Sequence, residues 1–273
     1  MLAARLPGIL PPLTRSESLE TTRIYSAMGL LPPGVALMDQ RPVRTPHHSA
    51  TAQALIGGGS IPRPGEVSLA HNGILFLDEL PEFSRHVLET LRQPLESGTV
   101  TIARVHGSVQ FPARFMLVAA MNPTASGHGE NGKSTQISDR YLARLSGPLL
   151  DRIDIHIEVP SVSHRELTSR QPGTSSEVMR QQVTVARDKQ HVRFKDSTTN
   201  ARMETKQLQG FCDLSPSCLL LMKQAMEELG LSARAYDKVR RVARTIADLE
   251  GADTIAENHL GEAIQYRLLD RRH

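Results

Sequence analysis

A short apolar run that ends in two acids constrains the fold of this chain more than any other feature. Residues 74–77 read Ile-Leu-Phe-Leu, and they follow Gly73 and precede Asp78 and Glu79. Four consecutive apolar residues predict a strand buried on both faces, as in a parallel sheet. Adjacent carboxylates at the end of such a strand repel each other and resist desolvation, so they usually meet a cation. We interpret Asp78 as a Mg²⁺ ligand and Glu79 as a residue that activates water; the alternative is two solvated acids in a turn.

A second apolar run, from Phe115 to Met121, ends in Asn122 and Pro123 and predicts another buried strand. Ligands of open α/β sheets bind beyond the carboxyl ends of the strands. Two strands that each end in polar side chains therefore indicate one crevice, in which Asn122 contacts a phosphate or its attacking water. The alternative is an Asn that caps a turn. Apolar strands and helical patterns over residues 73–159 together predict an α/β domain.

Residues 99–111 predict a β-hairpin with Arg104 and His106 near its tip. A helix over residues 82–93, with Phe83, Val87, Leu88 and Leu91 on its inner face, is expected between the first strand and this hairpin. An exposed basic tip can contact the phosphates of a polymer. A solvated turn explains the same pattern, so both interpretations stay open.

Two arginines occupy positions that suit phosphate binding. Residues 153–159 alternate in polarity and predict a strand, with Arg152 at its beginning. Arg152 either pairs with the flanking aspartates or reaches across a subunit boundary, as an arginine finger does.

Arg234 lies in the first turn of a helix that Ser232 caps, where a cation opposes the helix dipole at a cost of about 0.3–1 kcal/mol. A nearby anion, such as a nucleotide phosphate, would remove that penalty.

The chain is long enough for one large or two small domains. We expect a partial α/β core over residues 1–160, a linker and helix over 161–200, and an all-helical unit over 201–273. In that unit we expect three helices. The first would begin at Ser215 and end at Gly230, the second would begin at Ser232 and end at Gly251, and the third would be capped by Thr254 and Glu257. The packed face of the first helix would consist of Leu219, Met222, Met226 and Leu229.

The composition of the chain bears on its cellular location and on its binding partners. No apolar run approaches the roughly 18 residues of a membrane span, and two cysteines are too few for a disulfide framework, which favours a cytoplasmic location. The net charge of +3 permits nucleic acid as a partner without arguing for it. His47, His48 and the other histidines lack the spacing of a metal site, so we expect them to be satisfied or solvated.

Several segments resemble motifs of one protein family, and they occur in the order that the family has. Residues 74–80 resemble a Walker B strand, 121–123 resemble sensor 1, and 145–154 resemble an arginine-finger segment. Residues 231–249 resemble a sensor-2 helix, and 41–73 are similar to the insert of magnesium-chelatase-like proteins. The whole order resembles the ComM/YifB group of bacterial magnesium-chelatase-like AAA+ ATPases.

This resemblance implies an AAA+ core with a parallel sheet, followed by an all-helical lid that carries sensor 2. It implies hexameric rings with ATP and Mg²⁺ at the subunit interfaces, and DNA branch migration during natural transformation. By the same resemblance Asp78 binds Mg²⁺, Glu79 activates water, Asn122 senses the γ-phosphate, Arg152 acts in trans and Arg234 acts in cis. The hairpin would match the pre-sensor-1 hairpin.

The sequence departs from the family at the phosphate-binding loop. Residues 1–13 resemble the helix that normally follows this loop, so the core is expected to be incomplete. Residues 127–134 match GxxxxGK followed by Ser, but a working loop directly joins a strand to a helix, and here Asn122 and Pro123 come first. Without backbone amides and a Lys around the phosphates, most nucleotide affinity is lost. We expect this polypeptide alone to hydrolyse ATP weakly or not at all.

Two other functions are compatible with the same residues. A motor subunit of a metal chelatase would use the same ATP site, so these motifs do not separate it from a DNA-remodelling motor. A non-enzymatic remnant that docks into a partner ring would keep the fold without using the site.

Overall fold

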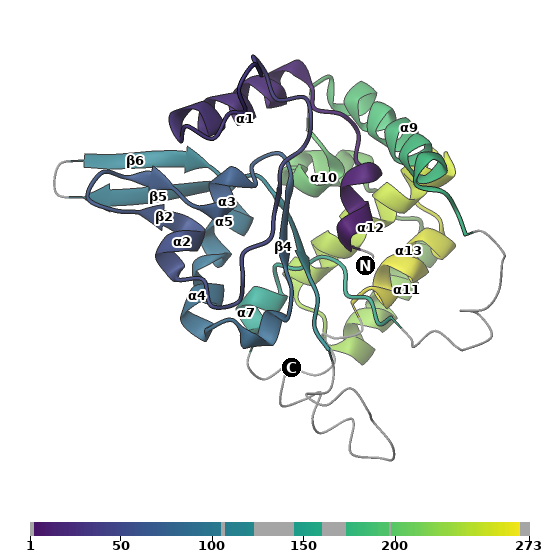
Figure 1. Cartoon of the computed structure of the whole chain (residues 1–273). Coiled ribbons are helices and arrows are strands. Elements are labelled where there is room, and N and C mark those ends of the chain that lie inside the picture. Colours follow the sequence, from purple (N-terminus) through teal and green to yellow (C-terminus); the bar gives the residue numbers. More distant parts are fainter. Residues whose placement is uncertain (1–2, 105–106, 123–144, 160–172, 197, 268–273) are drawn as a thin grey trace. The chain divides into compact units, whose positions relative to one another are not determined.

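The computed structural model describes residues 3–104, 107–122, 145–159, 173–196 and 198–267 (Figure 1). The chain divides into two compact units, of which the first comprises residues 1–7 and 12–152 and the second residues 8–11 and 153–273. The three-part division expected from the sequence stays a prediction. Among the described residues no helix combines the length and the apolar character needed to cross a membrane.

The first unit is built on a three-stranded parallel sheet, as predicted. Its strands are β1 (Val43–Arg44), β4 (Ile74–Leu77) and β7 (Met116–Ala119), in the order β1-β4-β7. In register, Ile74 lies opposite both Val43 and Met116. Strand β4 is central, and Ile74, Leu75 and Leu77 are at most 1% exposed. The prediction of a strand buried on both faces is therefore confirmed for β4.

The second predicted strand is present, but its predicted burial is wrong. Met116 in β7 is 45% exposed, and the rest of the strand is exposed or half-buried. In the described part of the chain β7 is an edge strand, paired on one side with β4. An apolar run alone does not distinguish a central strand from an edge strand, because both are rich in β-forming residues.

The predicted strand at residues 153–159 is also wrong. These residues are extended but belong to no sheet, and Ile157 is 69% exposed. The backbone N–H of His156 donates to the carbonyl of Tyr266 at 2.9 Å, which holds the segment against a helix end instead. Alternating polarity predicts a strand only where a partner strand is available, and the described residues supply none here.

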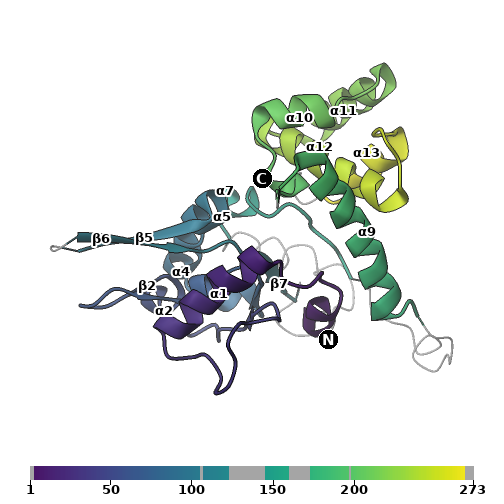
Figure 2. The ribbon, with the colours of Figure 1, turned by 90° about the horizontal axis from the view of Figure 1, so that it is seen from above.

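Short helices and two hairpins complete the first unit. The predicted hairpin is confirmed by the antiparallel pairing of β5 (Thr99–Arg104) with β6 (Gly107–Pro112), although residues 105–106 lie outside the described part of the chain. The hairpin extends away from the parallel sheet in both views (Figures 1 and 2). The other elements are η1 (Ala3–Gly8), α1 (Arg15–Ala27), α2 (Ala52–Ile56), β2 (Gly57–Gly58), β3 (Arg63–Pro64), α3 (Glu66–Leu69), η2 (Leu80–Glu82), α4 (Arg85–Thr90), α5 (Arg92–Ser97), β5 (Thr99–Arg104), β6 (Gly107–Pro112) and α7 (Gly147–Leu150).

The single helix predicted over residues 82–93 is two helices, α4 and α5, that meet near Leu91. Pro94 lacks a backbone N–H, and the first turn of a helix is where that loss is tolerated. The predicted inner face is correct, because it is buried throughout at Phe83, Val87, Leu88 and Leu91.

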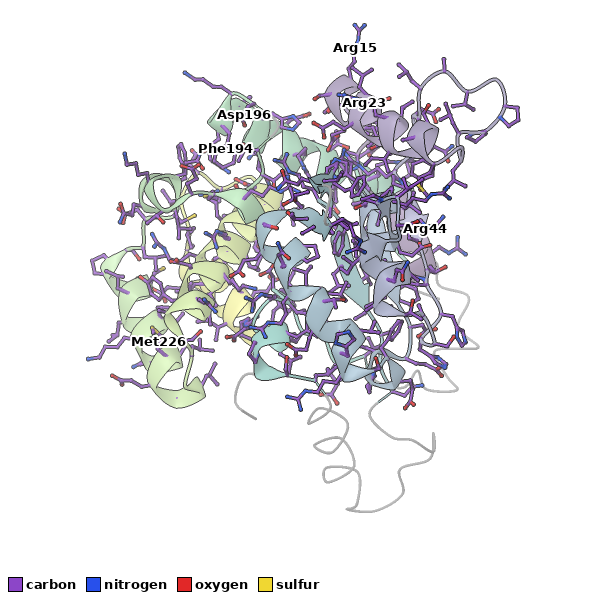
Figure 3. The ribbon with its side chains drawn as sticks, turned by 90° about the vertical axis from the view of Figure 1, so that its left-hand side faces the viewer. Arg15, Arg23, Arg44, Phe194, Asp196 and Met226 are labelled. Atoms are coloured by element: carbon purple, nitrogen blue, oxygen red, sulfur yellow. The ribbon has the colours of Figure 1, made fainter. Side chains whose placement is uncertain are left out.

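Helix α1 anchors the start of β1. Thr14 and Glu17 form a capping box at its beginning, and Tyr25 on its inner face donates to the carbonyl of Leu69 at 3.0 Å. Arg15 and Arg23 lie on its exposed face (Figure 3). Arg41 lies just before Pro42 and β1, and it donates to Oε2 of Glu17 at 3.0 Å.

The pKa of Glu17 is lowered. Burial alone would raise this pKa, but hydrogen bonds from Arg41 and Thr14 and the charge of Arg41 outweigh the effect of burial.

The second unit contains η3 and helices α9 to α13. The predicted caps of the first two helices of the all-helical unit are confirmed: Ser215 and Ser232 accept backbone N–H groups, and Gly230 and Gly251 end the helices with φ of +65° and +86°. The bounds are α9 (Ser176–Phe194), η3 (Asn200–Arg202), α10 (Thr205–Phe211), α11 (Pro216–Leu229), α12 (Ala233–Glu250) and α13 (Glu257–Gln265).

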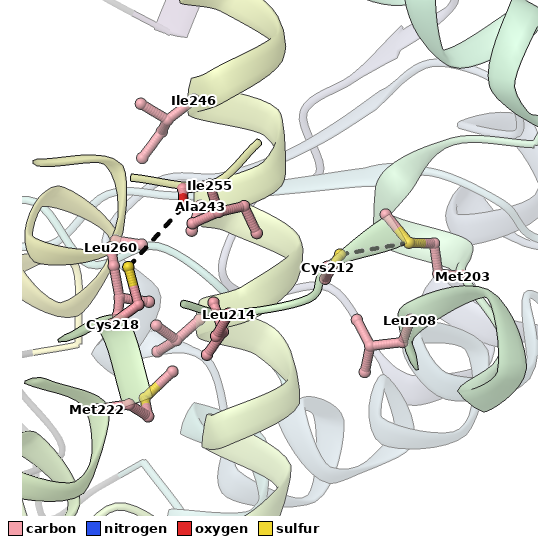
Figure 4. Packing of buried hydrophobic residues seen from close by; sticks show 12 residues of the cluster. Met203, Leu208, Cys212, Leu214, Cys218, Met222, Ala243, Ile246, Ile255 and Leu260 are labelled. Carbon is pink, nitrogen blue, oxygen red and sulfur yellow. Dashed lines mark hydrogen bonds between the residues drawn. The ribbon is translucent and has the colours of Figure 1, made fainter. Parts of the chain in front are cut away.

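Two details of the helical unit differ from the prediction. Helix α13 is not capped by Thr254; it begins after Ala256, whose N–H donates to Nδ1 of His259 at 3.0 Å. Leu219 is 48% exposed, whereas Cys218 is fully buried in its place. Figure 4 shows the core that results, with Cys218, Met222, Ala243 and Leu260 packed together.

Both cysteines are free and buried. Burial raises the pKa of the Cys212 thiol to about 11, so it stays protonated and unreactive at neutral pH.

Candidate functional site

Three strand ends meet at one edge of the parallel sheet in the first unit. Thr45 to His48 follow β1, Asp78 and Glu79 follow β4, and Asn122 comes shortly after β7. The N–H of Ala120 donates to the carbonyl of Leu77 at 2.9 Å, and the N–H of Leu80 donates back to the carbonyl of Ala120 at 2.9 Å. The structure therefore places the ends of β4 and β7 at the same edge, but Asn122 is not among the residues that line the cleft there, so its contact with a phosphate stays a prediction.

An open cleft of about 280 Å³ lies at this edge. The side chains of Asp78 and Glu79 are exposed to it. Its lining combines carboxylates, imidazoles, a hydroxyl and an aromatic ring, supplied by Thr45, Pro46, His47, His48, Phe76, Asp78 and Glu79.

The donor groups of the cleft fit a Mg²⁺ ion that arrives with a phosphate group. No cluster of three or more His, Cys, Asp or Glu side chains in the described part of the chain could hold a metal ion alone. Mg²⁺ usually takes one or two protein carboxylates and completes its six ligands with phosphate oxygens and water. Asp78, exposed at the end of β4, is suited to that partial role.

Glu79 leaves the strand in an unusual backbone conformation. Its φ of +52° and ψ of +48° are left-handed, which costs a residue with a side chain about 1–2 kcal/mol. Its N–H donates to Oδ1 of Asp78 at 3.0 Å, and its carbonyl accepts the N–H of Glu82 at 2.8 Å. Left-handed residues that are not glycine are found preferentially at functional sites, where the surrounding contacts enforce them.

His48 lines the cleft although no motif of the sequence indicates a role for it there. Its Nδ1 lies 3.3 Å from Oε2 of Glu79, which agrees with the expected satisfied or solvated histidine and adds a specific partner. The signal is weak in the sequence because β1, which carries the histidines to the sheet edge, has only two residues. A strand that short has no readable polarity pattern.

Arg152 lies elsewhere in the first unit, bound to a different acid from those expected. Its guanidinium donates to Oε2 of Glu96 at 2.8 Å and to the carbonyl of Pro148 at 2.5 Å, and its side chain is 12% exposed. Pairing with the flanking aspartates is not found: Asp154 instead pairs with Lys238 at 2.7 Å. The action of Arg152 in trans stays a prediction.

Arg234 belongs to the second unit. It is exposed in the first turn of α12, where Ser232 accepts the N–H of Ala235 at 3.2 Å. The predicted cap and the predicted position in the first turn are both present, and the role of Arg234 stays a prediction.

Arg104 ends strand β5 and is exposed. Its Nε donates to the carbonyl of Gly59 at 3.0 Å and its Nη1 to the carbonyl of Ala103 at 2.9 Å. Arg104 thereby ties the hairpin to the loop between β2 and β3. His106 and the loop at residues 127–134 lie outside the described residues, so their predicted roles are not tested.

Comparisons with known proteins agree with the order of the motifs. Residues 1–167 match the family described as "Magnesium chelatase, subunit ChlI", and residues 173–267 match "Magnesium chelatase, subunit ChlI C-terminal". The chain is 47% identical to competence protein ComM of Haemophilus influenzae, over 99% of this chain and 53% of that protein. It is 46% identical to protein YifB of Salmonella typhimurium, over 99% of this chain and 54% of that one.

A more distant relative is the magnesium-chelatase subunit ChlI of Nephroselmis olivacea, 27% identical over 94% of this chain and 66% of that protein. The chain spans about half the length of the ComM and YifB relatives that it matches. The chain therefore belongs to the magnesium-chelatase subunit ChlI family, within its ComM/YifB-type group of AAA+ proteins.

Proposed function

We propose that the edge of the β1-β4-β7 sheet is the hydrolytic half of an ATP site. The observation that carries this proposal is an open cleft at the ends of the parallel strands β1 and β4, with Asp78 and Glu79 exposed to it and the end of β7 at the same edge of the sheet. This is the edge at which α/β sheets bind ligands. Adjacent acids at the end of a buried strand suit a reaction that needs a metal ion and an activated water.

Each residue at the edge has a distinct part in this proposal. Asp78 would hold the Mg²⁺ of a Mg–ATP complex, and that ion would neutralise charge on the phosphates. Glu79 orients the attacking water and accepts hydrogen bonds from it. Asn122 contacts the γ-phosphate or this water from the end of β7, because an amide side chain both donates and accepts hydrogen bonds.

Two arginines complete the proposed site in an assembled ring. Arg152 would leave Glu96 and stabilise the γ-phosphate in a neighbouring subunit, and Arg234 would contact phosphate from the helical unit, acting as a lid. Guanidinium groups suit this role because they stay charged and bind phosphate oxygens in pairs. Ring assembly, with six subunits by analogy with the family, is part of the proposal.

We further propose that residues 1–273 alone bind and hydrolyse ATP weakly. The match to GxxxxGK at residues 127–134 is not expected to act as the phosphate loop, because β7 ends at Ala119 and does not lead directly into Gly127. Turnover by the purified 273-residue polypeptide that Glu79→Gln abolishes would contradict this part of the proposal.

For the whole protein we propose an ATP-driven motor that remodels branched DNA. The support is the greater similarity to a competence protein, 47% identical, than to a chelatase subunit, 27% identical. The projecting hairpin with exposed Arg104 offers a basic contact for DNA phosphates. A motor subunit of a metal chelatase is the alternative that shares the ATP site.

The ATP site can be tested in a chimaera in which residues 1–273 replace the matching segment of Haemophilus influenzae ComM. We expect Mg²⁺-dependent phosphate release, and we expect Glu79→Gln to reduce it at least about a hundredfold while nucleotide still binds. Glu82→Gln is the matched control, since Glu82 is an exposed acid of the next turn that does not line the cleft. Equal rates for Glu79→Gln and its parent would refute the proposed site.

The DNA proposal needs a separate readout in the same chimaera. Branched DNA should stimulate phosphate release, and the stimulation should weaken as salt rises, because phosphate contacts release counterions. Arg104→Ala should weaken DNA binding, whereas Arg85→Ala, which removes an exposed arginine of α4, should not. Stimulation by a tetrapyrrole instead of DNA would favour the chelatase alternative.

A further inference from the structure

His48 and Glu79 come from neighbouring strand ends and meet in the candidate cleft. His48 follows β1 and Glu79 follows β4, and these strands pair in parallel. Nδ1 of His48 lies 3.3 Å from Oε2 of Glu79, and both residues line the same cleft. This is an ion-pair separation, and an imidazole Nδ1–H is a donor group that a carboxylate oxygen can accept. The contact therefore links a residue outside the recognised motifs to the acid expected to activate water.

The His48 ring is held in place by two other rings. The His47 ring lies 4.0 Å away, centroid to centroid, at a tilt of 36°, and the Phe83 ring meets it edge-on at 6.4 Å and 82°. Phe83 is buried and ends the same short helix, η2, that Glu79 begins. Ring pairs in such tilted and edge-on arrangements are attractive and directional. His48 thus offers Glu79 a partner of defined position.

Glu79 has little else to fix its carboxylate. Its side chain is 56% exposed, and a glutamate has three rotatable side-chain bonds, so an exposed carboxylate samples several positions. Among the described residues, the hydrogen bonds of Glu79 involve its backbone. A water-activating group must be held within a fraction of an ångström, because small misplacements cost large factors in rate.

The contact contributes little to stability, which separates positioning from a structural role. His48 is 35% exposed and Glu79 is 56% exposed, and ion pairs in that environment are worth little. His47 differs in its partner, because its Nδ1 lies 2.9 Å from the Ser49 hydroxyl. His86, an exposed histidine of α4 that does not line the cleft, is the matched control.

We propose that His48 is a positioning residue that holds the carboxylate of Glu79 in the cleft, with its Nδ1–H donating to Oε2. Oε1 is then left to orient the water. This inference rests on the proposed function, and it adds a residue from the β1 end of the sheet to the site.

The kinetic test uses the ComM chimaera. His48→Ala should lower kcat about 10- to 100-fold while KM and nucleotide affinity stay within about twofold, because His48 is not expected to hold the nucleotide. His48→Asn should restore most of the rate, since its amide N–H can occupy the place of Nδ1–H, and His48→Leu should not. His86→Ala, which removes an exposed histidine of α4 outside the cleft, should keep the parental kcat. Parental kcat for His48→Ala would overturn the inference.

A second readout does not depend on turnover. In the ¹⁵N-labelled 273-residue chain, the Nδ1 resonance of His48 should be that of a protonated, hydrogen-bonded nitrogen. Glu79→Gln should shift it and leave the resonances of His86, an exposed histidine of α4 outside the cleft, unchanged. No shift at His48 would contradict the contact. If Glu79→Gln leaves hydrolysis intact, the proposed function fails; if Glu79→Gln is inactive and His48→Ala is not, only the present inference fails.

Discussion

Asp248 shows at the scale of one residue how the second unit accommodates buried charge. Its side chain is fully buried and receives hydrogen bonds from Arg193, Arg244 and Asn200. Asn200 also donates to the hydroxyl of Thr245 at 3.1 Å. Burial alone would raise the pKa of Asp248, but these hydrogen bonds and the two arginine charges outweigh it and lower the pKa. The carboxylate therefore stays ionised inside the helical unit.

Replacing Asp248 should destabilise the chain strongly. Asp248→Asn leaves the buried guanidinium of Arg244 and the largely buried one of Arg193 without their counter-charge, and loss of one partner in such a group costs about 3–5 kcal/mol. Urea denaturation at pH 7 measures this loss. As a control, Asp237→Asn removes a half-exposed acid of the same helix and should change the unfolding free energy by less than about 1 kcal/mol. An equal loss in both variants would contradict the account.

The lowered pKa of Asp248 determines how the stability of the chain changes with pH. Because its pKa in the folded chain lies below that in the unfolded chain, its contribution is complete above about pH 4. It is lost as pH falls through the folded pKa. The stability of the parent chain should therefore fall more steeply below pH 4 than that of Asp248→Asn. Parallel pH profiles for the two proteins would refute this assignment.

The backbone of Glu79 gives a second test at this scale. Glycine removes the strain of the left-handed conformation, whereas alanine keeps it, so Glu79→Gly should be more stable than Glu79→Ala by about 1 kcal/mol. Both variants lack the carboxylate, so both should be inactive in the chimaera. Urea denaturation of the two variants gives the difference. A more stable alanine variant would show that Glu79 is not left-handed in solution.

Some residue-level predictions hold because their cause is local. Ser215, Gly230, Ser232 and Gly251 bound helices through neighbours a few positions away, so their effect is readable in the sequence. The contact between His48 and Glu79 depends on the pairing of β1 with β4. No local pattern encodes that pairing, so sequence analysis missed it.

At the scale of elements, the sheet depends on a close approach at Gly73. The N–H of Ile74 donates to the carbonyl of Pro42 at 2.8 Å. A Cβ atom at Gly73 would lie 1.9 Å from that carbonyl oxygen. A side chain at this position would therefore push β1 away from β4 and move His48 from the edge of the sheet.

Gly73→Ala should lower the unfolding free energy by about 1–3 kcal/mol or more, because rigid backbone must shift to admit the methyl group. Gly210→Ala is the matched control: nothing lies within 4 Å of its added Cβ, and it is inside α10. That change should raise stability by about 0.5–1 kcal/mol. Thermal denaturation followed by circular dichroism compares them. A Gly73→Ala variant as stable as its parent would contradict the observed strand spacing.

Helices and strands could be predicted where only one structure accounts for their order of apolar and polar residues. Strand β4 is apolar throughout because it is central, and the prediction for it is confirmed. Strand β7 is similarly apolar yet half-exposed, and residues 153–159 alternate without joining a sheet. In both cases the outcome depends on which strands are available as neighbours, a property of the whole unit that a short window of sequence does not contain.

At the scale of the whole molecule, the proposed catalytic groups belong to both compact units. Asp78, Glu79, Asn122 and Arg152 lie in the first, and Arg234 lies in the second. The chain spans about half the length of its ComM and YifB relatives. The joint action of these groups on one nucleotide in an assembled ring belongs to the proposal.

The central claim is that the β1-β4-β7 edge hydrolyses ATP, and single-turnover phosphate release tests it most directly. ATP would be bound to the ComM chimaera, with Glu79 or Gln at position 79, and Mg²⁺ added to start the reaction. The account predicts release by the parent and retention of intact ATP by Glu79→Gln, with rates at least about a hundredfold apart. Equal single-turnover rates from equally bound ATP would contradict it.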